Sequence, residues 1–418
     1  MQYGLIGRKL AHSFSKEIHE SIGDYAYTLK ELEPQELDDF MIQRDFKAIN
    51  VTIPYKEAVM PYLDNISDFA KKIGAVNTIV NRDGKLYGYN TDCLGLKALI
   101  AKAGIELRDS KVLILGTGAT SKTAAAVAHD EGAASVIKVS RNAKEACITY
   151  DEMYALHSDA DVIINTTPCG MYPDCQSSPA DIERFFGLKG VIDVIYNPLR
   201  TALISSALSK GIRASGGLYM LVAQAVYAAE KFTGKVYDER ITDDIYGALR
   251  ADKENIVLIG MPSSGKSTVG RQLALLTGRK LIDTDDMIVK AHNMEISDIF
   301  SAHGEDVFRR WEAESVQQAA ANSGYIIATG GGAVLRHENV SALRQNGRIY
   351  FLDRALSELV PTSDRPLAQD AEAIKKRYEE RYSIYTSTAD EIVAVDTIAE
   401  TIAKRILASH TKGGTSDR

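Results

Sequence analysis

The stretch IVLIGMPSSGKSTVG, residues 256–270, joins an apolar segment typical of a buried strand to a glycine-rich turn and the start of a helix. Its spacing, G-x-x-x-x-G-K-[ST], is that of a phosphate-binding loop, in which backbone N–H groups at a helix N-terminus point at phosphate oxygens. A chance Gly/Ser turn explains the glycines but not this spacing after an apolar strand. The residues predicted to form the cradle are Gly260, Ser264, Gly265, Lys266, Ser267 and Thr268.

Short apolar runs alternate with helical patterns on both sides of this loop. Such runs are typical of strands buried on both faces, and helices between them indicate parallel sheets. The runs are residues 111–116, 135–140, 161–167, 190–196, 255–260, 325–332 and 348–353. An apolar helical pattern ends at Gly234, and the charged segment 235–254 is typical of a short helix plus a linker near 245–252. The polar tail 409–418 is predicted to be disordered.

These patterns predict an α/β chain of two domains or more, with a boundary near residues 245–252. The family resemblances that its motifs carry imply an α/β substrate-binding domain at residues 1–100, a Rossmann dinucleotide-binding domain at residues 101–245, and a P-loop domain with a parallel sheet at residues 252–410. A length of 418 residues fits this division, because one hydrophobic core rarely serves so long a chain.

Composition narrows the class of protein. Apolar content of 45% and charged content of 25% are ordinary for soluble proteins, and a net charge of −7 disfavours nonspecific nucleic-acid binding. We expect no membrane span and no signal peptide, because no apolar run approaches about 18 residues. The cysteines form no C-x-x-C pattern, which favours the reducing cytoplasm; they are Cys93, Cys147, Cys169 and Cys175.

Two patterns soon after the phosphate loop supply candidate ligands. Asp283 and Asp285 are two residues apart at a strand end, so one carboxylate can serve a metal while the other accepts a proton from a hydroxyl. An exposed acidic turn is the alternative. Arg309 and Glu312 are three apart on a helix and can pair, either as a surface ion pair or at a ligand site.

Three later patterns supply further candidate residues for a ligand site. Residues 330–332 are glycines at a strand end, where the backbone can approach a ligand closely. The segment PTSDRPL, residues 361–367, carries Arg365 and suits a lid that closes on a phosphate in transfer. The segment RYSIY adds Arg381 and Tyr385.

In this order the patterns resemble shikimate kinase along nearly all of residues 253–408. The resemblance implies that ATP and Mg²⁺ bind at the phosphate loop, with Lys266 on the β- and γ-phosphates and Arg365 reaching them from the lid. It implies Ser267 and Asp283 for Mg²⁺. It assigns shikimate to Asp285, Arg309, Gly331 and Arg381, of which the arginines take the carboxylate and Asp285 a hydroxyl. Ser263 departs from the family, which often has glycine there.

The front half contains a second glycine-rich turn, in LILGTGATSKTAAAVA, residues 113–128. Its G-x-G-x-x-S pattern is a weak dinucleotide fingerprint alone, but the next strand ends in Ser140 and Arg141, where an NAD site would place Asp or Glu. An arginine suits the 2′-phosphate of NADP; a solvated arginine is the alternative. The predicted cofactor contacts are Gly116, Thr117, Gly118, Ala119, Thr120, Ser140, Arg141 and Gly217.

Short motifs ahead of this turn carry candidate catalytic groups. In HSFS, Ser13 and Ser15 are two apart, so both hydroxyls of an extended chain face one way and suit a carboxylate. Each other candidate also has a structural reading: strand packing for Thr52, a surface position for Lys56, and a helix N-cap for Asp92. Asn77 lies between them in AVNT.

In this order the motifs resemble shikimate dehydrogenase over residues 1–240, continuing through INTTPCGM, DVIYNP and GLYMLVAQA. The resemblance implies Lys56 and Asp92 as the catalytic pair, since an ammonium can give a proton to an alkoxide that develops as hydride arrives. The family's substrate positions fall on Ser13, Ser15, Thr52, Asn77, Asp92, Tyr196 and Gln224. Lys16 and Ala119 depart from the usual proline and glycine.

The two resemblances together imply a bifunctional cytoplasmic enzyme. It would reduce 3-dehydroshikimate to shikimate with NADPH and then phosphorylate the 3-hydroxyl with MgATP, using small molecules and neither nucleic acid nor membrane. One alternative is an NAD-linked quinate/shikimate dehydrogenase joined to a different kinase, which Arg141, Arg309 and Arg381 argue against. The other is a regulatory module that senses shikimate without turnover. Its sites would not need the intact catalytic candidates Lys56, Asp92, Lys266 and Asp285.

Overall fold

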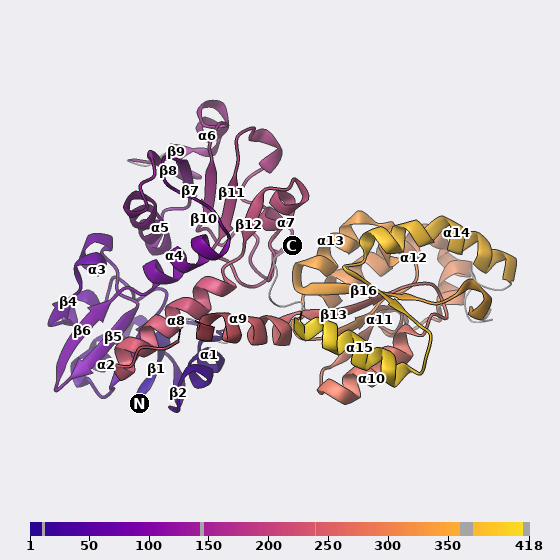
Figure 1. The fold of residues 1–418 in the computed structure, drawn as a ribbon, viewed down its shortest axis with the longest axis horizontal. Helices are drawn as coiled ribbons and strands as arrows, with labels where there is room; N and C mark the ends of the chain where they lie inside the picture. Colours follow the sequence, from indigo (N-terminus) through magenta and orange to yellow (C-terminus); the bar gives the residue numbers. More distant parts are fainter. Residues whose placement is uncertain (11–12, 143–145, 239, 360–370, 413–418) are drawn as a thin grey trace.

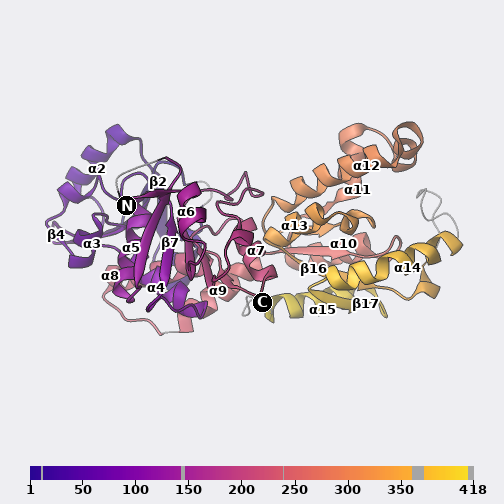
Figure 2. The same cartoon turned by 90° about the horizontal axis from the view of Figure 1, so that it is seen from above.

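The computed structural model describes residues 1–10, 13–142, 146–238, 240–359 and 371–412. The front and back halves of the chain lie side by side, and a helix of residues 240–253 runs between them (Figure 1). The view turned by 90° shows the same elongated arrangement (Figure 2). Within the described residues the strands form three sheets, two in the front half and one in the back half.

The first sheet is mixed, and it lies outside the apolar runs, residues 111–353, from which the parallel sheets were predicted. Its order is β2-β1-β3-β5-β6-β4, and β5 pairs with both neighbours in antiparallel fashion. The cause is local: Asp83 and Gly84, with φ of 53° and 81°, form a two-residue turn that folds β6 back on β5. The strands are β1 (Tyr3–Gly7), β2 (Tyr27–Glu31), β3 (Ala48–Val51), β4 (Asn65–Ile66), β5 (Thr78–Arg82) and β6 (Lys85–Tyr89).

Short helices cover this first lobe. They are α1 (Ser15–Ile22), α2 (Leu37–Gln43) and α3 (Asp68–Ile73), with the 3₁₀ turns η1 (Pro34–Glu36) and η2 (Met60–Tyr62).

The second lobe has the predicted Rossmann-type parallel sheet, of order β12-β11-β10-β7-β8-β9. Its inner strands are apolar because helices cover both faces. The strands are β7 (Lys111–Leu115), β8 (Ser135–Ser140), β9 (Ile148–Thr149), β10 (Val162–Asn165), β11 (Gly190–Asp193) and β12 (Arg213–Ser215). The helices are α4 (Asp92–Lys102), α5 (Ala119–Asp130), α6 (Tyr150–Leu156), η3 (Ile182–Arg184), α7 (Ala202–Ser209) and α8 (Leu218–Thr233).

Helices α4 and α8 join the two lobes. They approach closely at Gly95, where a Cβ atom would lie 2.7 Å from the Met220 carbonyl oxygen. Helix α8 then returns to the first lobe and packs against α1. The core of the first lobe therefore extends beyond residue 100, because it includes apolar residues of α8 and of the helix that follows it.

The back half has a parallel sheet of order β14-β15-β13-β16-β17, as predicted. Its strands are β13 (Asn255–Ile259), β14 (Leu281–Asp283), β15 (Ile326–Ala328), β16 (Gly347–Asp353) and β17 (Glu391–Ala394). Its helices are α10 (Lys266–Thr277), α11 (Thr284–His292), α12 (Ile296–Ala320), η4 (Ala333–Leu335), α13 (His337–Asn346), η5 (Leu356–Glu358), α14 (Ala371–Thr388) and α15 (Ala399–Lys412). Residues 409–412, expected in a disordered tail, belong to α15.

The junction between the halves is one continuous helix, α9 (Arg240–Lys253), where the sequence suggested a short helix plus a linker. Its apolar side buries Ile245, Tyr246 and Leu249 in the front half. Its last turn is held by the back half, since Arg279 Nη1 donates to the Glu254 carbonyl at 2.9 Å and His410 Nε2 lies 3.1 Å from the Ala251 carbonyl. A cut between residues 245 and 252 would divide this helix.

A buried histidine at this junction leads us to expect that the folded protein loses stability in acid. Burial lowers the pKa of His410 to about 4, so the folded protein holds this ring neutral between Ala251 and Tyr350. The unfolded chain takes up a proton near pH 6.5, so stability is complete above that pH and falls as the pH drops toward 4. The loss at pH 5 is about 2 kcal/mol from this group. Burial lowers the pKa of His19 to about 3, which adds in the same direction.

Thermal unfolding at pH 7 and pH 5 checks this expectation. A His410→Gln variant keeps hydrogen-bonding groups but does not titrate, so it should lose less stability on acidification than the wild type. An equal acid-induced drop in both proteins would contradict the assignment.

Candidate active sites

The first site centres on a lysine–aspartate pair. Lys56 Nζ donates to Asp92 Oδ2 at 2.5 Å, and the two side chains are only 14% and 11% exposed. Asp92 is the first residue of α4, and Lys56 lies in the turns that follow β3. The Lys56 backbone carbonyl accepts from Val76 N at 2.8 Å, which fixes this turn against the segment leading into β5. The pairing excludes the reading of Lys56 as an ordinary surface lysine.

Asn77 orients this pair. Its Nδ2 donates to Asp92 Oδ1 at 2.9 Å, while its Oδ1 accepts from the Thr91 backbone N–H at 2.7 Å. Gln224 Oε1, from α8, lies 3.4 Å from both Asn77 Nδ2 and Thr91 Oγ1. Thr91 was not among the sequence candidates, although it immediately precedes Asp92. Both oxygens of Asp92 therefore accept hydrogen bonds, one from Lys56 and one from Asn77, which holds the carboxylate in one orientation.

A polar and aromatic wall lies at the same edge of the first sheet. Ser13 Oγ donates to Ser15 Oγ at 3.1 Å, and the Phe14 ring between them packs on Tyr196, with 5.3 Å between ring centroids. Burial raises the pKa of Tyr196. Thr52 directly follows β3, and its N–H donates to the Ile6 carbonyl at 2.9 Å. The parallel pairing of β1 with β3 and the antiparallel pairing of β3 with β5 bring the residue after β3, Thr52, to the same edge as the start of β5.

The second lobe offers an open helix N-terminus at the carboxyl edge of its sheet. Gly116, with φ of 112°, lies so close to Thr166 that a Cβ atom would sit 2.8 Å from its hydroxyl. A Cβ at Gly118, the N-cap of α5, would meet nothing within 4 Å, so a ligand can approach the backbone there. Thr117 precedes this glycine, and Ala119 and Thr120 begin the helix. Ser140 ends β8 and is buried, whereas Arg141 beside it is exposed. Gly217 differs: a Cβ there would lie 2.1 Å from the Val194 carbonyl, so close packing explains this glycine.

A buried polar pair missed by the sequence analysis holds the loop that carries Tyr196. Asp193 accepts from Asn165 Nδ2 at 3.0 Å, from Ile195 N at 3.0 Å and from Thr201 Oγ1 at 2.7 Å. Burial raises the pKa of Asp193 to about 7. The sequence feature that could have indicated this pair is a polar residue at the end of each of two apolar strands, Asn165 in β10 and Asp193 in β11.

The phosphate loop of the back half has the expected backbone. Gly260 and Gly265 have φ of 148° and 96°, where residues with a Cβ are disfavoured. Ser263 also has a positive φ, 64°, which costs a non-glycine residue roughly 1–2 kcal/mol and explains why glycine suits this position. Lys266 Nζ donates to the carbonyls of Gly260 and Met261, each at 2.9 Å, so the ammonium lies over the loop.

A hydroxyl and a carboxylate meet beside this loop. Ser267 Oγ donates to Asp283 Oδ2 at 2.7 Å, and Asp283 Oδ1 accepts from the Asp285 N–H at 3.1 Å as the N-cap of α11. Thr268 follows in the first turn of α10. Oxygen ligands of this kind suit Mg²⁺, so the donor set fits the expected metal.

The glycine segment 330–332 gathers the remaining candidates. A Cβ at Gly330 would lie 2.5 Å from Asp285 Oδ1 and 3.0 Å from Glu312 Oε1, and one at Gly332 would collide with Arg309. The Gly331 carbonyl accepts from Arg381 Nη1 at 3.1 Å and from the Tyr385 hydroxyl at 2.5 Å. An added Cβ at Gly330 or Gly332 would therefore displace the side chains that line this segment.

Arg309 and Glu312 form a buried pair, not the surface ion pair that the spacing also allowed. Arg309 Nη1 donates to Glu312 Oε2 at 2.8 Å, and the side chains are 10% and 1% exposed. Burial raises the pKa of Glu312. Glu312 thus fixes the Arg309 guanidinium toward the glycine segment. Arg365 and the predicted lid, residues 361–367, lie outside the described residues.

A cleft of about 410 Å³ opens beside the phosphate loop. It is lined on one side by Gly265 and Thr268, and on the other by Arg354 and by residues 395–397 after β17. This volume lies in the range of small-ligand sites. None of the residues on its far wall was among the candidates predicted from the sequence.

Fold and site geometry define a two-lobed dinucleotide-dependent dehydrogenase followed by a P-loop kinase. Family models match on both sides: the shikimate dehydrogenase substrate binding domain at residues 5–79 and shikimate kinase at residues 262–411. A shikimate dehydrogenase (NADP(+)) of Clostridium beijerinckii is 38% identical over 261 residues, 58% of this chain and 96% of that protein. The chain belongs to the shikimate dehydrogenase family and carries a shikimate kinase domain in its back half.

Solved structures agree over the front half. Shikimate dehydrogenase 1 of Peptoclostridium difficile is 37% identical with a TM-score of 0.55, covering 60% of this chain and 98% of that one. A shikimate 5-dehydrogenase of Thermus thermophilus, solved with NADP(H) and shikimate, is 27% identical with a TM-score of 0.54, covering 59% and 98%. A chorismate mutase/shikimate 5-dehydrogenase fusion of Clostridium acetobutylicum is 37% identical with a TM-score of 0.56, covering 59% and 96%. The present chain is thus a bifunctional oxidoreductase and kinase of the shikimate pathway.

Proposed function

We propose that the front half reduces 3-dehydroshikimate to shikimate with NADPH and that the back half transfers the γ-phosphoryl group of ATP to the 3-hydroxyl of that shikimate. One observation carries the proposal: the same chain contains two groups of side chains suited to these reactions. In the first group, Lys56 pairs with Asp92 at 2.5 Å. In the second group, Asp285, Arg309 and Arg381 lie around the glycine segment 330–332. The first group suits reduction of a ketone, and the second suits a substrate with both a carboxylate and a hydroxyl.

In the first reaction, bound NADPH would supply the hydride. Lys56 donates a proton to the carbonyl oxygen as it becomes an alkoxide, and Asp92 orients the lysine through their hydrogen bond. Ser13 and Ser15 bind the substrate carboxylate, while Asn77, Thr52, Tyr196 and Gln224 hold the ring and its hydroxyls. Ketone, hydride and proton together give the alcohol.

In the second reaction, bound MgATP would supply the phosphoryl group. Arg309 and Arg381 hold the carboxylate of shikimate, and Asp285 accepts the proton of the 3-hydroxyl as its oxygen attacks phosphorus. Lys266 and the N–H groups of the phosphate loop neutralise the developing charge. Ser267 and Asp283 would hold Mg²⁺, and Arg365 would reach the phosphates from the lid.

Separate assays test the two halves of this proposal. The full chain should oxidise NADPH only when 3-dehydroshikimate is present, and should release ADP from MgATP only when shikimate is present. Absence of either substrate-dependent activity in the folded protein would overturn that half of the proposal.

We place the protein in the cytoplasm with small-molecule substrates. Its four cysteines, all among the described residues, are free thiols, as expected in a reducing compartment. In the described part of the chain, no helix has the length and apolar content to cross a membrane.

Cofactor choice gives a specific prediction. Arg141 is exposed directly after β8, where a guanidinium can hold the 2′-phosphate of NADP with two N–H donors. A charged hydrogen bond of this kind is worth about tenfold to 150-fold in affinity. Arg141→Ala should therefore weaken NADPH binding by that order and leave NADH nearly unaffected, with Arg141→Lys between. Equal kcat/KM for the two cofactors in the wild type, or a ratio unmoved in Arg141→Ala, would contradict this role.

A further inference from the structure

The kinase domain forms hydrogen bonds with a loop of the dehydrogenase, residues 194–201, which carries Tyr196 and is called the Tyr196 loop below. Asn346 Oδ1, at the end of α13, accepts from the Leu199 backbone N–H at 2.9 Å. The Gln345 carbonyl accepts from the Arg200 N–H at 2.8 Å. Asn346 and Gln345 are 2% and 4% exposed, so these bonds are shielded from water. Such buried amide bonds hold a loop in one position because breaking them leaves polar groups unsatisfied.

The side chain of Gln345 braces a second dehydrogenase segment. Its Nε2 donates to the Cys175 carbonyl at 2.7 Å, and its Oε1 lies 3.4 Å from Gln176 Nε2. This segment is itself tied to the Tyr196 loop, since the Tyr172 N–H donates to the Asn197 carbonyl at 3.2 Å. One turn of α13 therefore supports both segments.

The dehydrogenase anchors its own loop at the two ends and, through the Tyr172 N–H, at Asn197. Asp193 holds the Ile195 N–H and the Thr201 hydroxyl, and the Ile195 carbonyl accepts from Gly217 N at 2.8 Å. The bonds to Leu199 and Arg200 in between come from α13.

A second contact reaches the same wall from the last turn of α9. Lys253 Nζ pairs with Glu17 of α1 at 2.8 Å and lies 5.1 Å from the centre of the Phe14 ring. Phe14 packs in turn on Tyr196. The wall formed by Phe14 and Tyr196 is thus contacted from two sides by residues at the domain junction.

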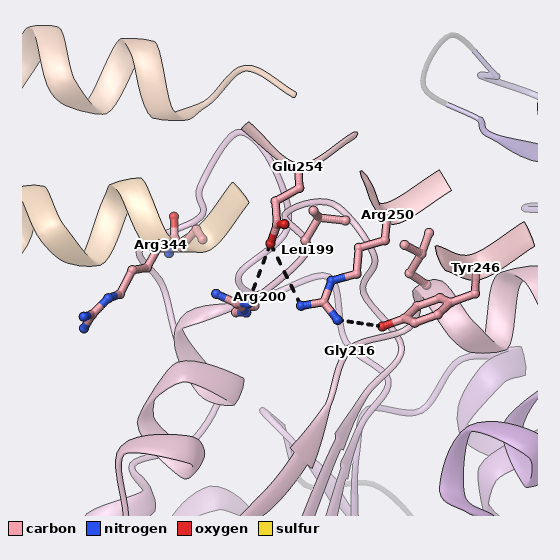
Figure 3. Close-up of a pocket in the computed structure, with 9 residues that line it drawn as sticks. Leu199, Arg200, Gly216, Tyr246, Arg250, Glu254 and Arg344 are labelled. Atoms are coloured by element: carbon pink, nitrogen blue, oxygen red, sulfur yellow. Dashed lines mark hydrogen bonds and ion pairs between the residues drawn. The ribbon is translucent and has the colours of Figure 1, made fainter. Parts of the chain in front are cut away.

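Charged groups complete the junction around a small pocket (Figure 3). Arg200 Nη2 and Arg250 Nη2 lie 3.7 and 3.9 Å from Glu254 Oε1, which is only 5% exposed. Arg344 lines the same pocket, but its guanidinium points away from Glu254 and donates to the Thr388 carbonyl within the kinase domain (Figure 3). Arg344 is therefore a matched control on the same turn of α13.

We propose that Asn346, Gln345 and Lys253 are positioning residues for the reduction, so that the kinase domain and its junction hold Tyr196 and Phe14 where the 3-dehydroshikimate ring binds. The inference rests on the proposed function of the first site. The dehydrogenase relatives described above align with 58–60% of this chain and with 96–98% of their own length, so their matched parts contain no counterpart of α13. The bracing is a property of the two-domain chain.

The test measures both activities of the full chain in Asn346→Ala. Loss of one buried hydrogen bond of about 1 kcal/mol should raise the KM for 3-dehydroshikimate about five-fold. The change should fall on this KM more than on kcat, because Tyr196 binds substrate and transition state alike. The KM for NADPH and the kinase constants should not move. Asn346→Asp keeps an acceptor for the Leu199 N–H and should return KM toward the wild-type value, and Arg344→Ala should leave it unchanged.

Three results would overturn the inference: an unchanged KM in Asn346→Ala, equal impairment in Asn346→Asp, or a parallel fall of both activities with the thermal midpoint. Lys253→Met provides a second arm should Asn346→Ala not fold. It removes the charge over Phe14 and should raise the same KM, and an unchanged value would also overturn the inference. A wild type that does not reduce 3-dehydroshikimate would instead overturn the proposed function, so the two failures are distinguishable.

Discussion

Replacing Lys56 with methionine is expected to lower kcat/KM for 3-dehydroshikimate reduction by about 10²–10⁴-fold, the usual contribution of a positioned proton donor. Methionine keeps the aliphatic stem but removes the ammonium that lies 2.5 Å from Asp92. The alkoxide then forms without a proton donor, and Asp92 loses its partner while still accepting from Asn77. Phosphorylation of added shikimate should be unchanged, because no described residue of the kinase site contacts Lys56.

The matched control is Lys97→Met. Lys97 lies on the same helix as Asp92 and also pairs with acidic side chains, Asp130 and Glu131, but on the surface. Its replacement should leave reduction unaltered. The account of the first site fails if folded Lys56→Met retains wild-type kcat/KM or if both activities are lost together.

The second large effect is expected in the kinase. Lys266→Met should reduce ATP-dependent phosphorylation of shikimate by about 10²–10³-fold, the range seen when a group that stabilises transition-state charge is removed. The Lys266 ammonium is held by the carbonyls of Gly260 and Met261 at the mouth of the phosphate loop, so its removal takes a positive charge away from that loop. Reduction of 3-dehydroshikimate should continue at the wild-type rate.

Lys404→Met serves as the control, since Lys404 pairs with Glu400 on the exposed side of α15. Steady-state rates of ADP formation measure both variants. Near-normal phosphorylation by Lys266→Met would remove the phosphate loop from the proposed mechanism.

Much of this architecture could be predicted because its parallel strands are buried on both faces. Residues 112–115 and 256–259 within the predicted runs are apolar throughout, and that pattern allows few other structures. The first sheet is different. A strand such as Tyr27–Glu31 buries only one residue fully, so its sequence, YTLKE, carries little apolar signal.

Helix α9 is a second segment whose structure its composition did not indicate. Its many charges suggested a linker, yet Ile245, Tyr246 and Leu249 have the spacing of a buried helical stripe. The charges simply occupy the solvated face.

Site residues with a distinctive local motif were predictable, and those that act through tertiary contacts were not. Lys56 and Asp92 stood out in their motifs, and the structure brings them together. Asp193 and Thr91 hold the site through buried hydrogen bonds, and neither lies in a motif that marks it as functional. Asn346 contacts Leu199, which is 147 positions away along the chain, so no local pattern could connect them.

The most direct test of the central claim is a single assay of the full chain with 3-dehydroshikimate, NADPH and MgATP, following both nucleotides and the organic product. We predict that NADPH oxidation and ADP release occur together and that shikimate 3-phosphate accumulates. Omitting NADPH should stop both reactions, whereas omitting ATP should stop the sequence at shikimate. ADP release without NADPH, or NADPH oxidation that yields a product the kinase domain does not phosphorylate, would contradict the account.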